Sequence, residues 1–146
     1  MIHVLSAILG LGPAYAFPFI LRRTSSVDEM RRCLIQVATL ETFPKIFGTI
    51  AVVSGLLLFF VGSYGSFAQI WILGALIAYV LIEVLIIGFV SPATQKLQQA
   101  MAGNNANPEQ IASDVMERMY AHVRNLHAWA GIGSLVIFIL MIVKPD

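Results

Sequence analysis

The sequence predicts an all-α protein, an antiparallel bundle of four transmembrane helices with helical extensions into the cytoplasm. Its composition is 58% hydrophobic and only 12% charged, whereas about a quarter of the residues of a soluble domain are charged. Four apolar segments approach the ~20 residues needed to cross the hydrocarbon core of a bilayer. These spans are residues 2–21, 46–61, 67–90 and 126–143, within a single integral membrane domain over residues 1–146.

The first apolar segment could instead be a secretory signal peptide, because residues 14–16 (Ala-Tyr-Ala) have the form of a cleavage site. No basic residue precedes the apolar stretch, however, and it continues beyond the tripeptide to Leu21. We therefore predict a membrane-spanning helix. Pro13 and Pro18 interrupt it, so we expect a kink.

The first connection, about residues 26–44, is predicted to contain an amphipathic helix. Residues 26–29 (Ser-Val-Asp-Glu) have the Ser-x-x-Glu spacing of a capping box, which predicts a helix that starts there and ends or kinks near Pro44. The second connection, residues 62–66, is long enough only for a tight turn. We therefore expect the second and third spans to be antiparallel neighbours.

The third connection, about residues 92–125, is also predicted to be amphipathic. Asn107 followed by Pro108 has the pattern of an N-cap and a first-turn proline. We expect a helix to begin at Pro108 and to continue into the fourth span. Residues 103–106 are predicted to form a loop before this helix.

The distribution of positive charge predicts the orientation of the bundle. Eight of the nine Lys and Arg side chains flank the first and third connections, and only Lys144 lies on the other side. Positively charged connections stay in the cytoplasm, so we expect both termini outside it. The eight residues are Arg22, Arg23, Arg31, Arg32, Lys45, Lys96, Arg118 and Arg124.

Every predicted span carries small residues at four-residue spacing. In lipid, such faces let helices approach closely and gain dispersion energy. The pattern predicts a tightly packed bundle, argues against a wide aqueous pore, and leaves open a homo-oligomer in the lipid bilayer. The residues are Ser6, Gly10 and Ala14; Ala51 and Gly55; Gly74 and Ala78; and Ala130 and Ser134.

Glu83 is a carboxylate inside the third span, about 10 Å from its cytoplasmic end. Such a group costs roughly 2.5–3.5 kcal/mol on insertion scales and usually serves a pathway or a partner. With Tyr79 one turn away on the same face, it predicts a proton or cation site, or a polar anchor for a ligand. The alternative is a buried group that fixes the register of the helix.

His127 opens the fourth span at a depth similar to that of Glu83, to which it could hydrogen bond. Gly131 and Ser134 follow on its face and leave space for a flat ligand such as haem. The alternative is an interfacial histidine without a ligand. His122 lies in the cytoplasmic helix and is predicted to be solvated.

His3 heads the first span above a row of small residues that includes Gly10. A ligand site there would need a second group from the outer end, such as Met141 or Gln69. Because the first and fourth spans start on opposite sides of the membrane, we expect His3 and His127 to be roughly 25–30 Å apart. One haem could not be bound by both.

Several classes of function are disfavoured. A single cysteine, Cys33, excludes an intrachain disulfide and a cysteine-based metal cluster; palmitoylation or burial of its thiol are the alternatives. No basic run of the density that nucleic acid requires is present. The sequence contains no phosphate-binding loop, catalytic triad, paired metal-ligand motif or dinucleotide fingerprint.

Residues 3–13, His-Val-Leu-Ser-Ala-Ile-Leu-Gly-Leu-Gly-Pro, and the following Phe-Pro at 17–18 resemble a bacterial family of small predicted integral membrane proteins with no assigned function. The segment is similar, more distantly, to the first span of the copper-resistance D membrane proteins and the HemJ-type protoporphyrinogen oxidases. Those proteins have a histidine followed by a tryptophan and glycines. His3 matches the histidine, Gly12 a glycine and Pro18 a proline further along.

The resemblance implies a multi-pass protein of the bacterial inner (plasma) membrane and, through the HemJ type, a haem-binding four-helix protein. Three positions depart from the HemJ pattern. Gly10 stands at the tryptophan position and Pro13 at a glycine position, and the third span has Glu83 but no lysine. These departures argue against oxidase activity, so we expect a protein that is not an enzyme.

Three functions follow from these residues. The first is binding of a small ligand or cofactor within the bundle, with haem as the first candidate and His3 as its ligand, or His127 at a separate site. The second is a transporter or proton-coupled membrane component centred on Glu83, Tyr79 and His127. The third is a structural or partner-binding subunit whose cytoplasmic helices dock other proteins.

Overall fold

The computed structural model describes residues 1–24, 26–62, 69–106 and 113–145, and contains no β-strand in this part of the chain. Four helical stretches are long and apolar enough to cross a membrane: Ile2–Ile20, Val27–Val61, Ile70–Gly103 and Asp114–Val143. This confirms the predicted all-α, four-helix fold. The elements are α1 (Ile2–Leu11), η1 (Gly12–Tyr15), α2 (Phe17–Ile20), α3 (Val27–Leu40), α4 (Thr42–Val61), α5 (Ile70–Leu85), η2 (Ile86–Val90), α6 (Ser91–Ala106) and α7 (Ser113–Val143).

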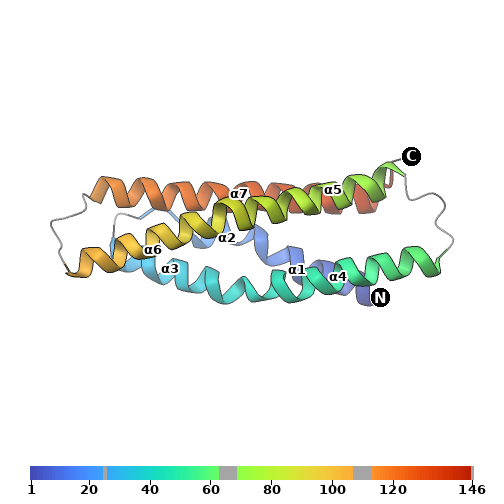
Figure 1. The fold of residues 1–146 in the computed structure, drawn as a ribbon, viewed down its shortest axis with the longest axis horizontal. Coiled ribbons are helices and arrows are strands. Elements are labelled where there is room, and N and C mark those ends of the chain that lie inside the picture. The colour runs from blue at the N-terminus through green and yellow to red at the C-terminus, as the bar shows by residue number, and fades with distance from the viewer. Residues whose placement is uncertain (25, 63–68, 107–112, 146) are drawn as a thin grey trace.

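The helices run side by side in one elongated bundle, and both ends of the chain lie at the same end of it (Figure 1). The opposite end, formed by α3, α6 and the first half of α7, carries most of the charged side chains, and we call it the charged end. The bundle is longer than a bilayer is thick, because α7 alone has 31 residues and a helix rises about 1.5 Å per residue.

The first span is broken where the prolines predict a kink. α1 passes into a 3₁₀ turn, η1, which contains Pro13, and α2 carries Pro18 in its first turn. A proline has no N–H and clashes with the carbonyl four residues earlier, so a regular α-helix cannot continue through it.

Helix α3 starts at Val27 as predicted, but the expected capping box is not formed. Ser26 makes no side-chain bond to the first turn. The Glu29 carboxylate accepts hydrogen bonds from the Thr24 hydroxyl, at 2.6 Å, and from the Arg22 guanidinium. Glu29 is thus drawn to the segment that precedes the helix, away from the N–H group that it would accept from in a capping box.

The α3–α4 rod bends at Glu41, close to the predicted position. α3 ends at Leu40 and α4 begins at Thr42. Pro44 cannot donate to the Leu40 carbonyl, which removes one bond of the helical ladder at this point. Pro44 therefore accounts for the bend, and the Glu41 side chain beside it contacts His127 on α7.

Helices α5 and α6 form a second bent rod, joined by the π-helical turn η2. Pro92 lies four residues after Gly88 and cannot donate to its carbonyl, which accounts for the wider turn. α6 continues to Ala106, so the predicted loop at 103–106 is wrong; a lone glycine lowers helix stability by only about 1 kcal/mol and does not end a helix by itself. The predicted start at Pro108 and most of the turn at 62–66 lie outside the described residues.

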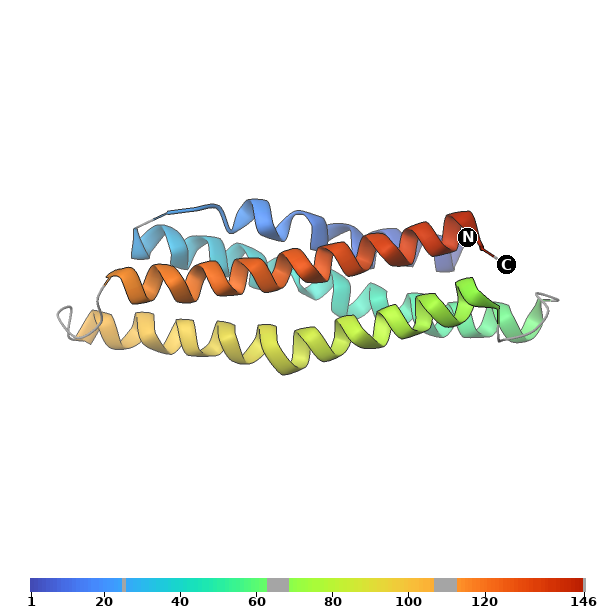
Figure 2. The ribbon, with the colours of Figure 1, turned by 90° about the horizontal axis from the view of Figure 1, so that it is seen from above.

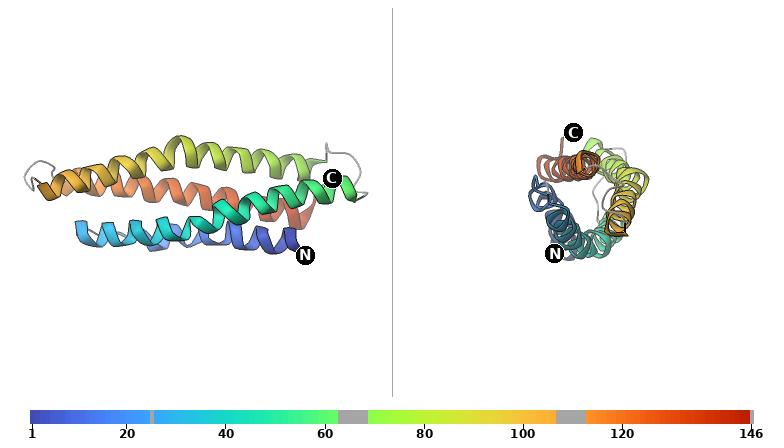
Figure 3. Two further views of the ribbon diagram at one scale, coloured as in Figure 1. Left: turned by 60° about the horizontal axis from the view of Figure 1, so that its bottom comes forward. Right: turned by 90° about the vertical axis from the view of Figure 1, so that its left-hand side faces the viewer.

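The described parts of the helices pack as two pairs, α1 with α4 and α5 with α7. A Cβ on Gly10 would lie 2.7 Å from the backbone nitrogen of Gly48, and one on Gly133 would lie 2.8 Å from Cγ1 of Ile82. The second and third spans run in opposite directions, as the short connection predicts, and the α3–α4 rod lies between α1 and the α5–α6 rod (Figures 2 and 3). The close contacts of α4 are with α1 rather than with α5.

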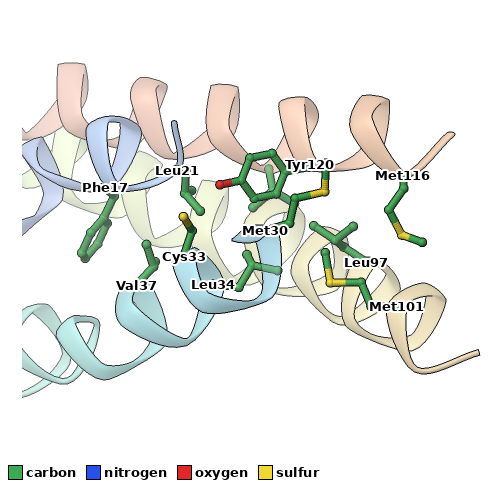
Figure 4. Packing of buried hydrophobic residues seen from close by; sticks show 11 residues of the cluster. Phe17, Leu21, Met30, Cys33, Leu34, Val37, Leu97, Met101, Met116 and Tyr120 are labelled. Carbon is green, nitrogen blue, oxygen red and sulfur yellow. The ribbon is translucent and has the colours of Figure 1, made fainter. Parts of the chain in front are cut away.

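A hydrophobic core joins the two pairs at the charged end (Figure 4). Side chains from α2, α3, α6 and α7 meet there, together with Leu21, which follows α2. The eleven buried residues are Phe17, Leu21, Met30, Cys33, Leu34, Val37, Leu97, Met101, Met116, Tyr120 and Val123.

Candidate functional site

A polar contact between His127 and Glu41 connects α7 to the bend of the α3–α4 rod. The Nε2 atom of His127 lies 3.3 Å from Oε1 of Glu41. The His127 side chain is 4% exposed, whereas that of Glu41 is 29% exposed. The pair therefore has a buried partner and a partner that reaches the surface.

Both ring nitrogens of His127 face hydrogen-bond acceptors. Nδ1 lies 2.9 Å from the carbonyl oxygen of Val123, one turn earlier on α7, and Nε2 faces the Glu41 carboxylate. A neutral imidazole has only one N–H, and an ionised carboxylate has none. The two bonds are satisfied together only when the pair holds one additional proton, on Nε2 or on the carboxyl group.

The surroundings hold the imidazole in place on one side and leave a route to water on the other. The ring of Phe17 meets that of His127 edge to face, with centroids 5.4 Å apart. On the other side, Nζ of Lys45 lies 3.4 Å from Oε2 of Glu41, and the Lys45 side chain is 70% exposed. Glu41 thus lies between a buried histidine and a solvated ammonium group.

The predicted partner of His127 is Glu83, and the structure corrects this. Glu83 is half-buried on α5 and is hydrogen-bonded to Tyr79. Tyr79 packs against the cluster of Ala75, Ile82 and Ile137 between α5 and α7. The structure therefore brings Glu83 and Tyr79 together, as their spacing predicts, and pairs His127 with a different carboxylate.

His3 joins α1 to α4. Its Nδ1 atom lies 2.7 Å from the carbonyl oxygen of Ala51, and the Ser54 hydroxyl oxygen is 3.5 Å away. The ring sits over Gly55, where a Cβ would come within 2.8 Å of Cε1. His3 is therefore built into the contact between two helices.

The grooves beside the two histidines do not fit a haem. The backbone of Gly48 fills the space against Gly10 below His3, and the Ala14 carbonyl lies 3.3 Å from where a Cβ on Gly131 would be, near His127. A planar macrocycle in either groove would require these helices to separate.

The two histidines also contact the α3–α4 rod at separate levels. Ala51, which contacts His3, comes ten residues after Glu41, which contacts His127, and this is about 15 Å along a helix. These two contacts are too far apart along the rod for one haem to be bound by both histidines.

Among the described residues, no group of three or more His, Cys, Asp or Glu side chains is arranged to hold a metal ion. Cys33 is 6% exposed within the core at the charged end, which agrees with the buried-thiol interpretation. His122 is exposed, as predicted.

Glu41 is the site residue that sequence reasoning missed. Its sequence neighbourhood places it only in an amphipathic helix. The signal that could have found it is Pro44 three residues later, because it predicts a bend beside Glu41.

A protein-family model described as "Predicted integral membrane protein (DUF2269)" matches residues 1–145. No curated protein and no solved structure matches the chain.

Proposed function

The chain belongs to this family of predicted integral membrane proteins, and we propose that it acts as a proton-coupled membrane component in which His127 and Glu41 share one proton. The observation that carries this proposal is the acceptor on each ring nitrogen of a buried histidine. Histidine is the side chain whose ordinary pKa lies closest to physiological pH.

The proton would control a contact between the two helix pairs. Glu41 belongs to the rod that packs on α1, and His127 belongs to α7, which packs on α5. With the proton present, a charge-assisted hydrogen bond joins them. Without it, the single N–H of the neutral imidazole can serve only one of its two acceptors, so the Glu41 contact between the helix pairs competes with the bond to the Val123 carbonyl.

The distribution of charge supports a cytoplasmic position for this site. The charged end carries the Lys and Arg residues that the positive-inside rule assigns to the cytoplasm. In this orientation the pair would respond to cytoplasmic pH, with Lys45 marking the side open to water.

Replacement of Glu41 by glutamine tests the proposal. The new side-chain amide can donate to Nε2, so both ring nitrogens of a neutral imidazole are satisfied and the pair needs no additional proton. NMR of ¹⁵N-histidine-labelled protein in nanodiscs would follow each imidazole through a pH titration, with the exposed His122 as the internal reference. An unchanged His127 titration in Glu41→Gln would refute the shared proton.

Glu83 is the second group that a transport function would require, because it is a carboxylate within the apolar span, bonded to Tyr79 and three residues before the π-helical turn η2. If protons cross the bilayer through the protein, Glu83→Gln should reduce proton flux into liposomes by about tenfold or more, the effect of about 1.4 kcal/mol on a barrier, and Tyr79→Phe should reduce it less. Equal fluxes in wild type and Glu83→Gln would restrict the function to the His127–Glu41 pair.

A further inference from the structure

A hollow of about 580 Å³ lies between the segment that follows α2 and the first half of α7. We call it the arginine hollow. It is separate from the His127–Glu41 pair, and neither of those residues lines it. Its lining residues are Arg23, Thr24, Glu117, Tyr120, Ala121 and Arg124.

The arginine hollow lies at the depth of the lipid headgroups. Arg23 comes two residues after Leu21, where the first span ends, and Arg124 comes two residues before Leu126, where the fourth begins. Trp129 on α7 is 64% exposed, and exposed tryptophans gather at membrane interfaces. Phosphate groups of the bilayer are therefore within reach of the hollow.

The hollow has positive charge that the described residues do not neutralise. Two arginines and one glutamate line it, which gives a net charge of +1. Arg23 and Arg124 form no ion pair within the described part of the chain, unlike Arg22, which is paired with Glu29. Both guanidinium groups can thus bind an anion.

Tyr120 forms the inner wall of the hollow, and its hydroxyl points into the core toward Cys33 (Figure 4). Its side chain is 2% exposed, and its hydroxyl has no hydrogen-bond partner among the described residues. Its polar neighbour in the core is the thiol of Cys33, which is only a weak acceptor. The tyrosine ring therefore closes the hollow toward the core, and the two arginines are the groups that can bind an anion.

We propose that the arginine hollow binds the phosphate group of an anionic phospholipid. Guanidinium groups bind phosphate oxygens bidentately, and basic pockets between transmembrane helices bind anionic headgroups. The same phosphate chemistry is available from free inorganic phosphate, but the position of the hollow at the membrane boundary favours the lipid.

Native mass spectrometry of the full chain in detergent would test this, with dioleoylphosphatidylglycerol as the probe. We expect Arg23→Gln and Arg124→Gln each to weaken lipid binding about fivefold, the factor that corresponds to about 1 kcal/mol for one arginine near the membrane surface. Arg118→Gln is the matched control, because Arg118 is an exposed arginine on the same helix outside the hollow.

Four results would overturn the proposal. They are equal affinity for dioleoylphosphatidylglycerol in wild type and the two hollow variants, an equal loss in Arg118→Gln, equal binding of dioleoylphosphatidylcholine, and binding of inorganic phosphate without the lipid. Circular dichroism of each variant would establish that a loss of binding does not come from unfolding.

Discussion

Gly55 is the residue of α4 that admits the His3 ring into the contact with α1. A Cβ at position 55 would lie 2.8 Å from Cε1 and 3.1 Å from Nδ1 of His3. Nδ1 is the atom that donates a hydrogen bond to the Ala51 carbonyl, at 2.7 Å. An added methyl group must therefore push the ring away from its acceptor, and the only relief is movement of His3 or of α1.

Gly55→Ala should lower the free energy of unfolding by about 1–3 kcal/mol, the usual cost of overpacking. In a His3→Ala background the clash is absent, and the same substitution should be neutral or stabilising by up to about 1 kcal/mol, because alanine forms helices better than glycine. Unfolding of the four proteins in mixed micelles would measure both effects. Equal effects of Gly55→Ala in the two backgrounds would contradict the contact.

The sequence predicts that a carboxylate lies beside His127, but it does not predict which carboxylate this is. Depth along the membrane normal predicts that a carboxylate approaches this histidine, and one does. Glu83 and Glu41 both suit that depth. The choice between them depends on how the helices rotate and pack against α7, and hydropathy and spacing carry no information about that packing.

At the scale of elements, the four spans were predictable because a helix that crosses the lipid must be apolar over about 20 residues. Hydropathy measures this property directly. Helix partners were not predictable from connection length. Only a short connection separates α4 from α5 in the chain, yet α4 packs more closely on α1. Small residues allow this contact, because Gly10 lies against the backbone of Gly48 and the His3 ring lies against Gly55. Helix ends were predicted well where prolines act, at Pro13 and Pro44, and poorly where weak helix formers such as Gly103 were expected to end α6.

The whole molecule consists of two helix pairs, which meet where η1 and α2 pack on α7 and in the larger core at the charged end. In the most apolar windows of the α3–α4 and α5–α6 rods, only 6% and 11% of residues are buried, against 33% for α7. Lipid can therefore contact most of α4 and α5, and α7 is the central helix. The core at the charged end and the His127–Glu41 pair both join α7 to the other rod, so a change in protonation there acts where the two pairs are connected.

Orientation in the membrane is the remaining property of the whole molecule, and it decides which compartment the His127–Glu41 pair senses. Lys144 and His122 are exposed and lie toward opposite ends of α7, and Cys33 is the only cysteine. In a Cys33→Ala background, we expect Lys144→Cys to react with a membrane-impermeant maleimide in spheroplasts, because both termini should lie outside the cytoplasm. His122→Cys should react only after lysis. The reverse pattern would place the charged end outside the cytoplasm and the proton-binding pair with it.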